Sequence, residues 1–260
     1  MQTHVRYRIR LARRGLMRFL GQLDMMRTIE RALRRCGFRL RPREGFRTNV
    51  KLSFPISLPL GFEAEREVFQ VDLGEEVSAE ELAAALQAEL PEGLTIVEVR
   101  RVGPYERVRL LATVYEFPVP PDRLAQVAAK VREWEKSASI PVAWARKSGL
   151  RHFDLRRDLR LMRLNGNRLR FEISHQRDPT VRPVEVLEWL GVADLLQEGL
   201  VVVRTDVVLA DEVEIQDGAG FSVEPDTQNV AGTGPSHQLH RTDGREGAEQ
   251  GKRRQRRGAE

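Results

Sequence analysis

Apolar and basic residues alternate strictly from residue 5 to residue 11. The apolar residues occupy the odd positions, and arginines occupy the even positions: Arg6, Arg8 and Arg10. A period of two predicts a half-buried strand, with one face on the core and the other face strongly basic.

A helical period follows. Apolar residues recur three and four positions apart from Leu20 to Arg35, which predicts an amphipathic helix that ends at Gly37. A second helix is expected from Ser78 to Leu90, because Ser78 and Glu81 form a capping-box pattern.

Extended segments and turns complete this half of the chain. We expect strands, or extended segments, at residues 38–41, 50–54, 67–73 and 94–102. The same order then recurs. Strands or extended segments are expected at 113–119, 141–146, 151–155, 158–164, 168–174 and 200–209, and helices at 122–135 and 183–190. Asn165-Gly166 predicts a tight hairpin turn between two of these strands.

The order of the elements predicts an α+β fold. Both halves fit strand–helix–strand–strand–helix–strand, so we expect two tandem ferredoxin-like (βαββαβ) domains with antiparallel sheets, at residues 1–108 and 109–216. This prediction depends on element order alone, since the two halves share little sequence. Residues 217–260 are too polar to bury a core, and we expect a disordered tail. Its basic run at 252–257 would add non-specific phosphate affinity or serve only as a solubilising extension.

Composition narrows the class of protein. We expect no membrane span, because no segment approaches the ~20 consecutive apolar residues that a span needs. Arginines stand near the N-terminus where a signal peptide would be apolar, so we expect a cytoplasmic protein. Cys36 is the single cysteine, which excludes an intrachain disulfide and any cluster held by cysteines of this chain alone.

Charge is distributed unevenly along the chain. Residues 1–60 hold fourteen arginines and Lys51 against three acidic residues, whereas residues 61–100 hold eleven acidic residues against two arginines. A concentrated basic segment is typical of proteins with a phosphate-rich partner. The alternative is that the two blocks neutralise each other within the fold.

Several sequence blocks resemble a known bacterial family. These blocks lie at residues 8–27, 30–35, 45–46, 51–54, 58–61, 154–156 and 179–187. Over about residues 5–210 the chain resembles the radical-SAM-linked (radical-SAM-associated) proteins, a domain of unknown function. The resemblance implies a radical SAM protein as partner and a process that involves RNA or translation. The chain has Gly21-Gln22 where that family commonly has Ser-His, and residues 47–50 replace a loop rich in proline and histidine. A chemical role of those histidines would therefore be lost here.

Catalytic patterns are scarce. His152 lies near Asp154 and Asp158, and His175 precedes Asp178, so either histidine could pair with a carboxylate. Histidines beside acidic residues are common on protein surfaces, and no metalloprotease, nucleophile-elbow or phosphate-loop motif is present. We expect no catalytic residue, no cofactor and no metal site.

The sequence therefore favours binding over catalysis. Our first hypothesis is a non-catalytic RNA-binding or substrate-presenting accessory protein that assists a radical SAM enzyme. The alternatives are a docking subunit of such an enzyme without nucleic-acid contact, and a metal-independent endoribonuclease. Nine residues are the candidates for binding RNA or the partner: Arg6, Arg8, Arg10, Arg14, Arg18, Arg27, Phe46, Arg47 and Lys51.

Overall fold

The computed structural model describes residues 4–43, 46–103, 106, 108–146, 149–176 and 180–213, with the backbone alone for 42–43 and 46–50. The described residues all belong to one compact unit. The predicted tail at 217–260 lies outside the described residues, and the predicted boundary after residue 108 stays a prediction.

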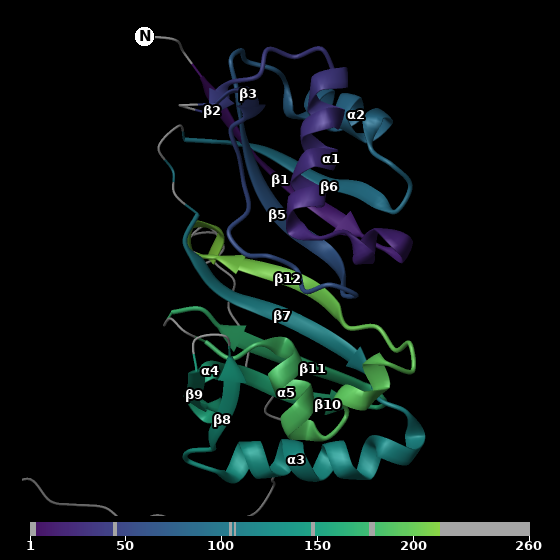
Figure 1. Ribbon diagram of the computed structural model, residues 1–260. Coiled ribbons are helices and arrows are strands. Elements are labelled where there is room, and N and C mark those ends of the chain that lie inside the picture. The colour runs from purple at the N-terminus through teal and green to yellow at the C-terminus, as the bar shows by residue number, and fades with distance from the viewer. Residues whose placement is uncertain are drawn as a thin grey trace, which may run out of the picture. The chain divides into compact units, whose positions relative to one another are not determined.

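The fold is mixed α+β, as expected (Figure 1). The first half contains β1 (Val5–Arg13), α1 (Gln22–Arg35), β2 (Pro42–Arg43), β3 (Phe46–Val50), β4 (Leu52–Ser53), β5 (Glu63–Leu73), α2 (Ala79–Glu89) and β6 (Leu94–Val102). The second half contains β7 (Leu110–Pro118), α3 (Leu124–Lys136), β8 (Pro141–Arg146), β9 (Gly149–Asp154), α4 (Leu155–Asp158), β10 (Leu159–Asn165), β11 (Arg168–Ser174), α5 (Pro183–Leu190) and β12 (Val203–Leu209).

Local signals account for many of these bounds. The Ser78 hydroxyl accepts a hydrogen bond from the Glu81 amide at 3.1 Å, which confirms the predicted cap of α2. Gly166 has a φ of 58°, as the tight turn between β10 and β11 requires. The strand expected at 38–41 is reduced to one bridge, between Leu40 and Leu73.

Among the described residues, both halves contribute strands to a single eight-stranded sheet. Its order is β10-β11-β7-β12-β5-β1-β6, with β4 on β5, and the pairs are antiparallel except β12 with β5. We expected a sheet for each half. The two halves join because β12 and β5 leave free edges that pair at Val203–Glu63 and Arg204–Ala64. The segments predicted at 141–146 and 151–155 pair with each other as β8 and β9, apart from this sheet.

Two main apolar clusters form the core. In the first half, α1 and α2 pack on β1 and β5, whereas α3 and α5 pack on β7, β10 and β11 in the second. The opposite face of β1 carries the even-numbered arginines, since Tyr7, Ile9 and Leu11 point into the core. In the part of the chain that the structure describes, no helix has both the length and the apolar character needed to cross a membrane.

Candidate nucleic-acid interface

The predicted basic face of β1 is buried. Arg8 and Arg10 are only 2% and 4% exposed. A charged side chain that is buried to this extent needs carboxylate partners, because its desolvation is costly.

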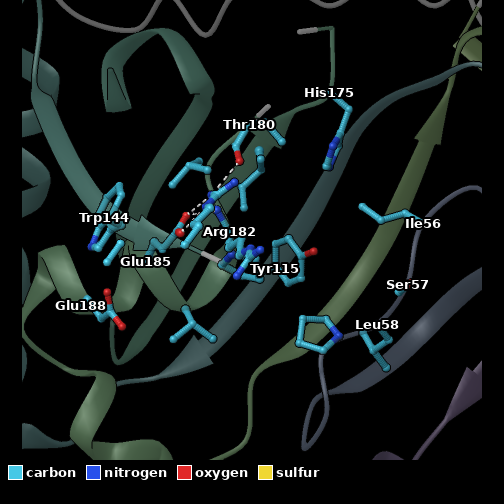
Figure 2. A pocket seen from close by; sticks show the side chains of 17 residues that line it. Ile56, Ser57, Leu58, Tyr115, Trp144, His175, Thr180, Arg182, Glu185 and Glu188 are labelled. Atoms are coloured by element: carbon cyan, nitrogen blue, oxygen red, sulfur yellow. Dashed lines mark hydrogen bonds and ion pairs between the residues drawn. The ribbon is translucent and has the colours of Figure 1, made fainter. Parts of the chain in front are cut away.

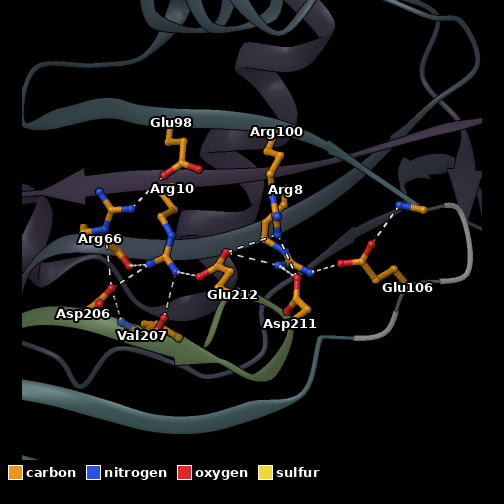
Figure 3. Close-up of polar contacts among 11 residues, drawn as sticks. Arg8, Arg10, Arg66, Glu98, Arg100, Glu106, Asp206, Val207, Asp211 and Glu212 are labelled. Carbon is orange, nitrogen blue, oxygen red and sulfur yellow. Dashed lines mark hydrogen bonds and ion pairs between the residues drawn. The ribbon is translucent and has the colours of Figure 1, made fainter. Parts of the chain in front are cut away.

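An acidic segment at the end of the described chain provides those partners (Figure 3). Arg8 lies 2.5 Å from a carboxylate oxygen of Asp211 and 2.8 Å from one of Glu106. Arg10 contacts Asp206 at 2.9 Å and also pairs with Glu212. We call residues 206–212 the acidic segment. It belongs to β12 and to a helical turn at residues 210–213.

Asp211 resolves a repulsion within the sheet. Arg8 and Arg100 stand directly opposite each other on β1 and β6, and both contact the same oxygen of Asp211, Arg100 at 2.9 Å. Burial alone would raise the pKa of Asp211, but its hydrogen bonds and charge interactions, led by Arg8, hold that pKa below its usual value. This cluster is therefore an internal network of ion pairs between distant parts of the chain.

Asp72 neutralises a second group of cations. Two hydrogen bonds, of 2.6 and 3.0 Å, join its carboxylate to Arg6. Lys51 lies 3.1 Å and Arg41 3.6 Å from the same side chain. Burial would raise the pKa of Asp72, and the hydrogen bonds from Arg6 and Lys51 lower it below the usual value.

The other predicted binding residues are dispersed. Arg14, Arg18 and Arg27 pair with Glu65, Glu63 and Asp24, at 3.4, 3.7 and 3.2 Å. The side chains of Phe46 and Arg47 lie outside the described residues. The contacts of β1 thus favour the alternative in which its arginines neutralise acidic residues of the fold, and their contact with RNA stays a prediction.

A second arginine cluster, which we did not predict, lies on β10 and β11. Met162, Leu169 and Phe171 of these strands point into the core, so the intervening residues form the opposite face. Four exposed arginines belong to it, and we call them the arginine face: Arg160, Arg163, Arg168 and Arg170.

The register places like charges together on this face. Arg163 stands directly opposite Arg170, and Arg168 lies two residues from Arg170 on the same strand. Directly opposed like charges destabilise a sheet. The guanidinium of Arg163 makes no ion pair or hydrogen bond within the described residues.

Acidic neighbours only partly neutralise the cluster. Glu116 contacts Arg170 at 3.1 Å and Arg168 at 3.4 Å, and Glu172 contacts Arg160 at 3.1 Å. The two glutamates are 23% and 20% exposed, whereas their arginine partners are 45–69% exposed. Positive charge therefore lies outermost. The alternation within residues 159–174 could have revealed this face, but the concentration of arginine near the N-terminus drew our prediction there.

The predicted histidine–carboxylate pairs find little support. The His152 side chain is exposed and makes no ion pair or hydrogen bond within the described residues. Asp154 instead accepts hydrogen bonds from Ser139 and from the Ile140 and Arg156 amides, at 2.8–3.0 Å. His175 lies 2.9 Å from the Thr113 hydroxyl, and its predicted partner Asp178 lies outside the described residues.

Fold and contacts together define an α+β protein with an exposed, cationic sheet face. The chain belongs to the family described as "Uncharacterized protein conserved in bacteria (DUF2344)", whose model matches residues 6–183. That description names no activity, so the link to radical SAM chemistry stays a prediction.

No curated protein matches the chain. Two solved structures are "Crystal Structure of an Unknown Protein from Galdieria sulphuraria" and "Crystal structure of putative glycine cleavage system transcriptional repressor". The first is 13% identical with a TM-score of 0.26, and covers 80% of this chain and 99% of that one. The second is 9% identical with a TM-score of 0.24, and covers 79% and 97%. At these TM-scores neither structure informs the fold or the function.

Proposed function

We propose that this protein binds single-stranded RNA through the arginine face and presents it to a radical SAM partner, without catalysing a reaction itself. The observation that carries the proposal is the direct opposition of Arg163 and Arg170 on an exposed sheet surface. A cluster of outermost cations costs stability in the free protein. Phosphate groups would relieve that repulsion, and guanidinium groups bind phosphate through charge-assisted, bidentate hydrogen bonds.

The arrangement of strands supports a single-stranded ligand. The strand orders β6-β1-β5-β4 and β12-β7-β11-β10 fit one ferredoxin-like unit in each half, which we include in the proposal. RNA-binding modules of this kind use the sheet face that the helices leave open, and arginine planes can stack on unpaired bases. The acidic segment occupies the corresponding face of β1, whereas the face of β10 and β11 keeps its arginines exposed.

The partner is part of the proposal because of the family resemblance. Radical SAM chemistry needs a three-cysteine cluster motif, and Cys36 is the single cysteine of this chain. Any radical step would therefore be performed by another polypeptide, and this protein would hold the RNA.

A pair of matched double variants tests RNA binding. Arg163→Gln/Arg170→Gln should weaken binding of a fluorescent single-stranded RNA about tenfold at low salt, measured by anisotropy. Arg132→Gln/Lys136→Gln removes the same charge from exposed positions of α3, and should change the affinity less than twofold. Both variants keep the C-terminal basic run, so its contribution to RNA affinity is the same in both.

Equal weakening by the two variants would show that only net charge matters. Absence of binding by the unmodified protein would overturn the RNA proposal and favour the docking subunit. Copurification of the radical SAM partner, retained by Arg163→Gln/Arg170→Gln, would then identify that alternative.

A further inference from the structure

A pocket of about 790 Å³ lies on the core side of the second half, away from the arginine face (Figure 2). Its wall combines the loop at residues 56–59, strands β7, β8 and β11, and the start of α5. Small-molecule sites span roughly 300–1,000 Å³ and are mostly apolar with a few placed polar groups. The volume therefore suits a small organic ligand.

The lining is largely apolar. Leu58, Tyr115 and Val181 are buried side chains that line the pocket. Trp144 forms a further part of the wall, and its ring lies 5.9 Å from that of Phe153. An indole flanked in this way offers a flat surface to a planar ligand.

Arg146 and Glu185 form a polar wall of the pocket, and their charges neutralise each other. Arg146 donates two hydrogen bonds to the Glu185 carboxylate, at 3.0 and 2.6 Å, and a third to the Thr180 carbonyl at 3.1 Å. Its guanidinium also lies 4.3 Å from the centre of the Phe153 ring. Glu185 in turn accepts the Arg182 amide at 2.6 Å. These contacts fix the wall and leave no net charge on it for a ligand.

Arg182 differs from Arg146 because no carboxylate neutralises its charge within the described residues. Its side chain is exposed and lines the pocket, and its guanidinium makes no ion pair and donates no hydrogen bond within the described residues. It directly precedes Pro183, the first residue of α5, where the helix dipole is positive. Figure 2 shows Arg182 near the centre of the site and Glu188 at its margin.

His175 adds a neutral polar group. Burial, followed by the positive charge of Arg204, lowers the pKa of His175 to about 4, so the ring is uncharged near neutral pH. A ligand here meets apolar walls, a neutral imidazole and the guanidinium of Arg182, which has no partner within the described residues.

We propose that this pocket binds an organic anion with a flat, apolar body, with the anionic group at Arg182 and the body against Trp144 and the apolar wall. Glu188 is the one lining carboxylate without a partner within the described residues. It opposes an anion and would set the ligand's orientation, with the charged end away from it.

The probe for this test is 1-anilinonaphthalene-8-sulfonate, which joins a planar apolar body to a sulfonate. N-phenyl-1-naphthylamine is its uncharged counterpart. With the full-length protein, Arg182→Gln should weaken sulfonate binding about tenfold and change the binding of the uncharged probe less than twofold. Glu188→Gln should tighten sulfonate binding up to about threefold. Arg132→Gln, at an exposed position of α3, should leave both affinities unchanged.

A variant of the flat wall locates the probes. Trp144→Ala removes the indole that lines the pocket, and should weaken the binding of both probes at least tenfold. The proposal is overturned if Arg182→Gln leaves sulfonate binding unchanged, if both probes weaken equally in that variant, or if Trp144→Ala leaves both affinities unchanged. Because Arg182 lies outside the arginine face, failure here leaves the RNA proposal intact, and the reverse also holds.

Discussion

At the scale of single residues, the buried ion pair of Arg204 and Glu67 leads to a direct prediction about stability. Arg204 and Glu67 are 1% and 3% exposed and pair through the Arg204 Nε at 2.7 Å. Arg204 also donates to the Ser57 carbonyl at 3.1 Å. This pair joins β12 to β5, where the two halves of the sheet meet. An isolated buried charge is far more costly than a buried pair, so each member depends on the other.

Glu67→Gln should therefore destabilise the fold by about 3–5 kcal/mol, because it leaves the charge of Arg204 buried without its counter-ion. Glu98→Gln is the matched control, since Glu98 pairs with Arg66 at 2.8 Å on the surface, where such pairs contribute about 0–1 kcal/mol. Denaturant unfolding measures both. Equal losses for the two variants would contradict the role of the buried pair.

His175 should make stability depend on pH. Its pKa of about 4 in the folded protein lies below the unfolded value of about 6.5, so the unfolded chain binds a proton more readily between these values. Stability should fall as pH falls from about 6.5 to 4, by about 1–3 kcal/mol after allowance for the partial exposure of the ring.

His175→Gln should flatten this part of the curve of unfolding free energy against pH. His152→Gln, at an exposed histidine, should leave the curve as it is. Curves of the same slope for the unmodified protein and His175→Gln would refute the depressed pKa.

At the scale of elements, the β10–β11 hairpin combines a predictable turn with an unpredicted surface. Asn165-Gly166 and the alternation of its strands predicted the hairpin, but its two-residue loop is Gly166-Asn167, because Asn165 pairs with Arg168. The direct opposition of Arg163 and Arg170 depends on which residues of β10 and β11 pair. That register depends on which two residues form the loop, and the sequence alone left this open.

Arg163→Gln should leave stability unchanged or raise it by a few tenths of a kcal/mol, because it removes a like-charge contact. Arg160→Gln should instead cost up to about 0.5 kcal/mol, since it breaks the pair with Glu172. Thermal unfolding compares the two. A clear loss of stability in Arg163→Gln would show that this arginine supports the fold and would weaken its assignment to RNA.

Other elements show what sequence reasoning could supply. The helix at Pro183–Leu190 has the predicted bounds, since Pro183 starts it and Gly191, with a φ of 72°, ends it. The strand at Val5–Leu11 was also predicted, although the burial of its basic face was not. Arg8 and Asp211 are separated by 203 positions, and no local pattern indicates a contact over that distance.

At the scale of the whole molecule, the eight-stranded sheet explains why many arginines of the basic N-terminal block are not exposed. The N-terminal basic block meets acids such as Asp72 and the acidic segment, so much of it is neutralised inside the fold. That outcome matches the alternative that the charge distribution had suggested for Asp72, which lies in the acidic block 61–100, but the acidic segment that pairs with Arg8 and Arg10 lies outside that block. The positive charge that stays outermost on a single sheet face belongs to β10 and β11, in the other half of the chain.

The most direct test of this account is the slope of log Kd against log salt concentration for single-stranded RNA. Each phosphate neutralised on a single strand contributes about 0.7 to the slope. Arg163→Gln/Arg170→Gln should therefore give a slope shallower by about 1.4 than the unmodified protein, whereas Arg132→Gln/Lys136→Gln should give a parallel line. Parallel lines for all three proteins would contradict the claim that the arginine face contacts the RNA backbone.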